Sequence, residues 1–131
     1  MKKKKITGKG EFIYDYKYDT LTFKMKDRNY KRSIEIQNFA IDIDDKNLIT
    51  GIRVFDASKV FGVDKYVLKN IVQGEFKADV EKKIVTITLK FVGMQRNKII
   101  PLLTQKQNFM HQITTPVKNM ADSTVECAAL S

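Results

Sequence analysis

The chain has 131 residues, 43% of them hydrophobic, which is the size and composition of one domain with a packed core. Its 24 Lys and Arg residues against 15 Asp and Glu give a net charge of +9. Cys127 is the only cysteine, which excludes an internal disulfide and a zinc site built from cysteines. No apolar run has the length of a membrane span or a secretion signal, so we expect a cytoplasmic protein without membrane contact.

The first third of the chain alternates between apolar and polar residues, as strands do. After a basic tail over residues 1–9, the pattern predicts a strand over 12–19 with an aromatic face and a second strand over 21–25 that pairs back on it. A short extended piece follows at 34–36. In the next strand, Phe39, Ile41 and Ile43 are predicted to point inward, with Asp42 and Asp44 facing water.

A tight turn at Asp44 to Asn47 is predicted to lead into a strand over residues 48–55. Asn47 stands where a hairpin turn needs a positive φ, which Asn tolerates better than most residues. A helical segment is expected over 57–71, with Asp56 as its N-cap, an interruption at Gly62 and a second N-cap at Asp64.

The second half is also predicted to consist of strands. Residues 75–80 and 84–92 form a hairpin with Val85, Ile87, Leu89 and Phe91 on one face. Residues 97–103 form an apolar strand whose Pro101 restricts it to an edge or a bulge. Weaker patterns predict strands over 109–115 and 123–129. The sequence therefore predicts a single α+β domain of predominantly antiparallel β meanders with a short helical segment.

The two halves echo one another, since Gly10-Glu11-Phe12 recurs as Gly74-Glu75-Phe76 and the residues that follow keep the same order of apolar positions. This favours a first β unit over 10–56 and a repeated unit over 72–131, each of four strands, related by a twofold pseudo-axis. Shared alternation between unrelated strands is the other interpretation.

Residues 12–60 carry a pattern of separate elements in a fixed order: Tyr-Asp, an Asp followed by Leu, an Asp-rich turn, Gly-Ile and a closing Asp-Ala-Ser. The residues are Tyr14, Asp15, Asp19, Leu21, Asp44, Asn47, Gly51, Ile52, Asp56 and Ser58. This pattern resembles the domain of unknown function 2283 family of small prokaryotic proteins. The resemblance implies a strand meander with a short helix and no established activity, and some members are thought to act as antitoxin-like proteins.

Few side chains suggest chemistry. Asp42, Asp44 and Asp45 have the spacing of calcium ligands, but Lys46 occupies the next ligand position and no Glu closes the loop. A Cys127 and His111 nucleophile pair is conceivable, although His111 has the place of an outward strand residue. Asp56 and Ser58 more simply cap a helix. We therefore expect no catalytic residues, no metal and no cofactor.

Two kinds of partner remain. The leading interpretation is a non-catalytic protein-interaction module, antitoxin-like in its role, that acts through a sheet edge or the helical segment; open strand edges also permit a homo-oligomer. The alternative is a nucleic-acid-binding protein that uses the basic surfaces of residues 1–33 and 82–118. In that case the tyrosines would stack on bases while Lys17, Lys31 and Arg32 contact phosphates.

Overall fold

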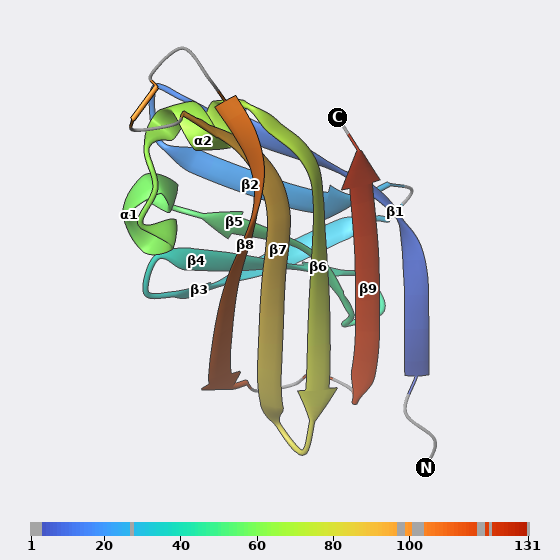
Figure 1. Cartoon of the computed structure of the whole chain (residues 1–131). Helices are drawn as coiled ribbons and strands as arrows, with labels where there is room; N and C mark the ends of the chain where they lie inside the picture. The colour runs from blue at the N-terminus through green and yellow to red at the C-terminus, as the bar shows by residue number, and fades with distance from the viewer. Residues whose placement is uncertain are drawn as a thin grey trace.

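The computed structural model describes residues 4–26, 28–96, 99–100, 104–117, 120 and 122–130. They form one nine-stranded sheet, with two short helices that follow the fifth strand along the chain and precede the sixth (Figure 1). The elements are β1 (Lys4–Asp15), β2 (Thr20–Met25), β3 (Tyr30–Ile36), β4 (Phe39–Asp44), β5 (Ile49–Val54), α1 (Ala57–Phe61), α2 (Lys65–Lys69), β6 (Ile71–Glu81), β7 (Ile84–Arg96), β8 (Thr104–Pro116) and β9 (Ser123–Leu130). The predicted class, mostly antiparallel strands with a short helical segment, is confirmed.

The strand order across the sheet is β3-β4-β5-β2-β1-β9-β6-β7-β8, so β3 and β8 are the two edges. Strand β1 joins the two halves of the chain. Its second part, from Gly10 to Asp15, pairs antiparallel with β2, whereas its first part, from Lys4 to Lys9, pairs parallel with β9. The prediction of a basic tail over residues 1–9 is therefore wrong for residues 4–9, because main-chain groups pair in a strand whatever side chains they carry.

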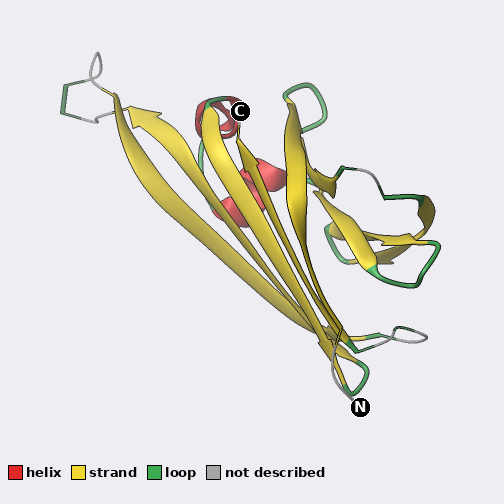
Figure 2. Cartoon of the chain, turned by 90° about the vertical axis from the view of Figure 1, so that its right-hand side faces the viewer, coloured by secondary structure: helices red, strands yellow, loops and turns green. Residues whose placement is uncertain are grey.

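The sheet curls so that its two portions face each other, with the helices between them (Figure 2). Phe23 of β2 packs against Gly74 of β6, where an added Cβ would lie 2.6 Å from the Phe23 ring. Phe39 of β4 and His111 of β8 stack with their ring centroids 5.7 Å apart. The core thus lies between the shorter strands of the first half and the longer strands of the second.

The two helices close the core on the β8 side. Gly62 has a φ of 67° and ends α1, as predicted, because glycine adopts this left-handed conformation without strain. Phe61 sits edge-on to Phe91 of β7 with centroids 4.9 Å apart, and Val67 and Leu68 of α2 are buried. No helix within the described residues is both long and apolar enough to cross a membrane.

Most predicted strands are confirmed, and the face of Val85, Ile87, Leu89 and Phe91 is buried as expected. The first strand ends at Asp15 and not at Asp19, because Tyr16 to Asp19 form the turn into β2. Asp44 is buried instead of facing water. Of the predicted strand over 97–103, Ile99 and Ile100 form a bend and the other residues lie outside the described part of the chain.

The strand pairing of the two halves departs from the predicted repeat. The β1–β2 and β6–β7 hairpins are similar, but Phe12 faces Phe23 across the first, while Phe76 faces Leu89 across the second, two positions away from the residue that a strict repeat requires. The remaining strands differ in order, since β5 pairs with β2 whereas β9 pairs with β6. The strand order of the sheet therefore does not follow the predicted twofold pattern.

Candidate interaction surface

Asp19 ties the first hairpin to the helices. Its carboxylate accepts hydrogen bonds from the Tyr14 hydroxyl at 2.6 Å, the Ser58 hydroxyl at 2.6 Å and the Ser58 main-chain N–H at 3.1 Å. Burial opposes the ionisation of Asp19, but the bonds from Ser58 and Tyr14 outweigh it and hold the pKa of this carboxyl below its usual value. Burial, together with Asp19, raises the pKa of Tyr14 above its usual value.

This arrangement corrects the predicted helix cap. Asp56 adopts a left-handed conformation with a φ of 52°, and its side chain makes no capping bond. The carboxylate of Asp19, 39 positions away in sequence, receives the N–H of Ser58 in the first turn of α1 instead. Asp64 does occupy the N-cap position of α2, but its side chain likewise makes no capping bond.

Asp44 organises the turn between β4 and β5. One carboxylate oxygen accepts the N–H groups of Lys46 at 2.9 Å and Leu48 at 3.0 Å, and the other pairs with Arg28. Burial opposes the ionisation of Asp44, yet these partners, led by the Leu48 N–H, keep its pKa below the usual value. Asn47 has a φ of 61°, which confirms the predicted turn.

The other residues of the family pattern also have structural roles. Leu21 and Ile52 are buried in the core, and the Asp15 carboxylate accepts the Tyr18 N–H at 3.1 Å within the β1–β2 turn. A Cβ at Gly51 would lie 2.8 Å from the Phe23 carbonyl oxygen, so only glycine allows β2 and β5 to approach this closely. These four residues of the pattern thus help to build the fold.

The three residues predicted to contact nucleic acid do not come together. Lys17 lies in the β1–β2 turn, whereas Lys31 and Arg32 lie near the start of β3, three strands away and toward the opposite end of the sheet. With strands spaced about 4.8 Å apart, the separation across the sheet alone is about 14 Å. These side chains therefore do not form one phosphate-binding site.

Lys17 instead belongs to a cluster of tyrosines and lysines at the β1–β2 turn. The Lys65 and Lys69 ammonium groups lie 5.0 and 5.5 Å from the centroid of the Tyr16 ring, and that of Lys17 lies 5.4 Å from the Tyr18 ring. Tyr16 and Tyr18 are 55% and 67% exposed. The sequence pattern predicts that both lie on a strand face, which is wrong because both lie in the turn, on the surface.

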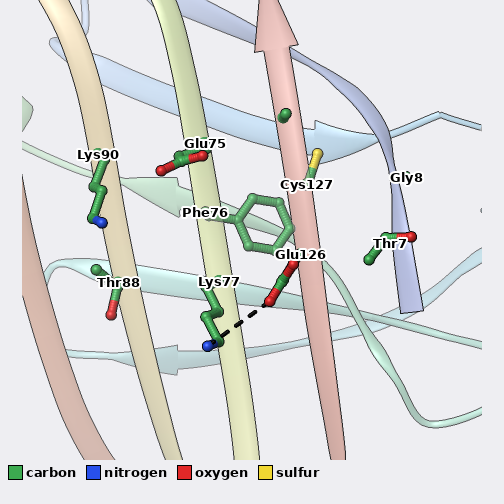
Figure 3. A pocket seen from close by; sticks show the side chains of 10 residues that line it. Thr7, Gly8, Glu75, Phe76, Lys77, Thr88, Lys90, Glu126 and Cys127 are labelled. Carbon is green, nitrogen blue, oxygen red and sulfur yellow. Dashed lines mark ion pairs between the residues drawn. The ribbon is translucent and has the colours of Figure 1, made fainter. Parts of the chain in front are cut away.

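The outer face of the second half has a shallow hollow of about 530 Å³ over β1, β9, β6 and β7 (Figure 3). Its charged side chains are Glu75, Lys77, Lys90 and Glu126. The Lys77 ammonium lies 3.8 Å from the Glu126 carboxylate. Opposite charges alternate here, and solvent reaches both members of this pair. The hollow has no net charge that would select an ionic ligand.

His111 and Cys127 do not form a nucleophile pair. His111 faces the core beside Phe39 and Phe61, which corrects the prediction that it points outward. It lies in one row with Leu89, Phe76 and Cys127 across four neighbouring strands, so three strand spacings, about 14 Å, separate it from the thiol. Burial raises the pKa of Cys127 to about 11.

The calcium interpretation finds no geometric support. Asp42 binds Arg53 and Ser33 on the outer face of the sheet, Asp44 binds its own turn, and Asp45 is exposed. Throughout the described part of the chain, no three His, Cys, Asp or Glu side chains gather in the manner of metal ligands.

The two edges of the sheet differ in what they offer a partner. Strand β3 has seven residues, a register shift between Tyr30 and Arg32, and three charged side chains. Strand β8 has 13 residues and no register shift against β7, and between Gln107 and Thr115 it contains no Lys, Arg, Asp or Glu. Long, regular and uncharged edges are the ones that accept another strand.

The main-chain groups of β8 can be assigned to its two sides. The Val117 N–H donates to the Lys83 carbonyl at 2.9 Å, and the register between β7 and β8 is unbroken from Ile84 to Arg96. Because antiparallel ladders alternate, odd-numbered residues of β8 direct their N–H groups to β7 and even-numbered residues direct theirs outward. Pro116, which has no N–H, stands at an even position. Among the described residues, no main-chain partner occupies this outer side.

Comparison with known proteins agrees with the pattern in the first half. The model of the family described as Protein of unknown function (DUF2283) matches residues 11–58. An uncharacterised protein of Methanocaldococcus jannaschii is 33% identical over 88 residues, which cover 66% of this chain and 76% of that relative. A Methanosarcina mazei protein, provisionally named hypoxanthine phosphoribosyltransferase, is 29% identical over 90 residues, 69% of this chain and 73% of its own. No solved structure matches. The chain belongs to the DUF2283 family through the domain at residues 11–58.

Proposed function

We propose that this protein is a non-catalytic protein-interaction module that binds an extended polypeptide segment alongside β8. The observation that carries this proposal is the 13-residue, unbulged edge of β8, whose even-numbered residues other than Pro116 direct their N–H groups outward. A strand edge is complementary to another strand, because every second residue supplies both a donor and an acceptor. Nucleic acid offers no such regular match.

The burial of the family's polar side chains supports a binding role over a catalytic one. Asp19 and Asp44 use both carboxylate oxygens in internal hydrogen bonds, which leaves them unavailable to a substrate. The phosphoribosyl transfer in the name of the Methanosarcina mazei relative is not part of this proposal. Both described helices have only five residues, and neither follows a glycine-rich phosphate-binding loop.

The test selects peptides of about 12 residues from a random display library on the immobilised full chain. Selected peptides are then measured by fluorescence anisotropy against wild type, Gln112→Pro and Gln112→Ala. Both variants lose the same side chain, which bonds Thr88 at 3.3 Å, but only proline removes an outward N–H. We expect Gln112→Pro to weaken binding about tenfold and Gln112→Ala to leave it unchanged. Peptides that bind all three proteins equally would contradict the proposal.

A second candidate function is binding of single-stranded nucleic acid at the tyrosine and lysine cluster. It is favoured by the exposed rings of Tyr16 and Tyr18 and by the lysines that lie beside them. Binding of a labelled 20-nucleotide RNA should then weaken steeply with salt and fall in Tyr16→Ala, but not in Gln112→Pro. RNA binding without peptide binding would favour this candidate over the first.

A further inference from the structure

We infer that the segment paired with β8 is β8 of a second copy of this chain, antiparallel about a twofold axis at Met110. This inference rests on the proposed function, because it names the strand that the β8 edge receives. The result would be a continuous sheet of two chains, with the core of each molecule unchanged.

The main chain of β8 is complementary to itself in this arrangement. The antiparallel pairing that overlaps all 13 residues places Met110 opposite Met110, since Thr104 and Pro116 are equally far from it. Even-numbered residues then face even-numbered residues, so that outward N–H groups meet outward carbonyls. The residues from Lys106 to Thr114 would form about ten hydrogen bonds between the chains. Pro116, the position without a donor, falls at the end of the pairing.

The side chains are compatible with the same register. On the outer face, Asn108 would lie opposite Gln112, and Lys106 opposite Thr114, so no two like charges meet. Met110 is 65% exposed in the single chain and beside an apolar hollow of about 390 Å³ that Val92 also lines. Pairing would cover both Met110 side chains with each other, which removes apolar surface from water.

The opposite edge is not suited to this role. The register shift between Tyr30 and Arg32 bends β3. The Ser33 hydroxyl bonds Asp42 at 2.7 Å and receives Arg53 at 3.0 Å, so charged groups surround this edge. A copy of β3 would bring Lys31, Arg32 and Glu35 against their counterparts. Self-pairing is therefore assigned to β8 alone.

The first experiment is sedimentation equilibrium of the full chain from about 1 µM to 1 mM. We expect wild type and Gln112→Ala to form dimers with the same dissociation constant. Gln112→Pro removes one donor from each strand, and we expect a dissociation constant about 100-fold higher, a factor of ten for each lost bond. Circular dichroism and thermal melting verify that the variants fold. A wild type that stays monomeric throughout would overturn the inference.

The second experiment fixes the register. Met110→Cys and, as its control, Thr86→Cys on the outer face of β7 are made in a Cys127→Ala background. Directly opposed residues of a hydrogen-bonded antiparallel pair have Cα atoms about 5.5 Å apart, within the range of a disulfide. We expect Met110→Cys to form a disulfide-linked dimer on mild oxidation and Thr86→Cys to remain a monomer. Equal cross-linking of the two would overturn the proposed axis.

These outcomes separate the two proposals. A monomeric protein that still binds peptides in a manner sensitive to Gln112→Pro would overturn the homodimer and leave the β8 edge as a site for another polypeptide. A dimer with equal dissociation constants for Gln112→Pro and Gln112→Ala would overturn pairing through β8. A monomer that binds no peptide in this manner would overturn both.

Discussion

The two edges of the sheet, β3 and β8, differ in how well their main chains are suited to pair with another strand. Edge β3 is short, bulged and bordered by Arg28, Arg53 and the buried carboxylate of Asp44. Edge β8 is long and has no register shift against β7. Its nine residues from Gln107 to Thr115 include no Lys, Arg, Asp or Glu. Natural sheets usually protect both edges. This difference is the reason for placing the proposed partner strand at β8 and not at β3.

The largest effect is expected on the β3 side of the sheet, at Asp44. Asp44→Ala should lower the free energy of unfolding by about 3 kcal/mol, because it leaves the partly buried Arg28 and two turn N–H groups without their acceptor. Asp45→Ala is the matched control, since Asp45 is its exposed neighbour in the turn. Urea denaturation measures both. An equal, small loss in the two variants would show that Asp44 does not hold the β3 side of the sheet.

The same carboxylate predicts how the stability of the protein depends on pH. The pKa of Asp44 is lowered in the folded protein from an ordinary 3.8. Its contribution to stability is therefore fully present above that ordinary pKa and is lost as pH falls through the lower folded value. Urea midpoints between pH 6 and pH 2 should decline less steeply in Asp44→Asn than in wild type. Parallel profiles would contradict this origin of the acid sensitivity.

A smaller effect, on dimerisation, should appear when charges are placed on β8. In the proposed register Asn108 lies opposite Gln112 of the second chain, so Asn108→Lys with Gln112→Lys would place like charges face to face at two symmetric points. We expect dimerisation to weaken about tenfold. Asn108→Lys with Gln112→Glu, which pairs opposite charges, should restore it. If the two double variants dimerise equally in sedimentation, the register is wrong.

The smallest effect is expected on the outer face of β6 and β9. The Lys77 ammonium and the Glu126 carboxylate lie 3.8 Å apart, with side chains that are 57% and 40% exposed. Lys77→Ala should change the free energy of unfolding by about 0.5 kcal/mol or less, because water screens such pairs. It should not alter the dimer dissociation constant. A change in dimerisation would indicate that the outer face, and not only the β8 edge, takes part in the interface.

Much of the fold could be predicted because alternation in single strands is a local signal. The inward faces of β4 and β7, the turn at Asn47 and the interruption at Gly62 each depend on a few neighbouring residues. The paired strand at Lys4 to Lys9 could not be predicted in this way. Its lysines and glycine carry no apolar alternation, and its partner lies at the far end of the chain.

The candidate site was harder to predict for the same physical reason. The Asp19 carboxylate meets the N terminus of α1 through a contact between residues 39 positions apart, whereas a local pattern points to Asp56, which is adjacent in sequence. The alternation of β4 predicts that Asp44 faces solvent, because its inward position becomes favourable only with Arg28 and the turn N–H groups in place. The edge position of β8 follows from strand order, which no local pattern encodes.

The parallel contact of β1 with β9 also has a consequence for how the protein folds. Lys4 pairs with Ser123, a separation of 123 minus 4, or 119 positions, and nearly the whole chain must be ordered before that contact can form. Contacts of such high sequence separation slow folding. We therefore expect the β1–β2 and β6–β7 hairpins to form early and the β1–β9 ladder to form last. Hydrogen exchange pulsed during refolding should protect the N–H groups of Ile6 and Gly8, which point toward β9, later than those of the hairpins.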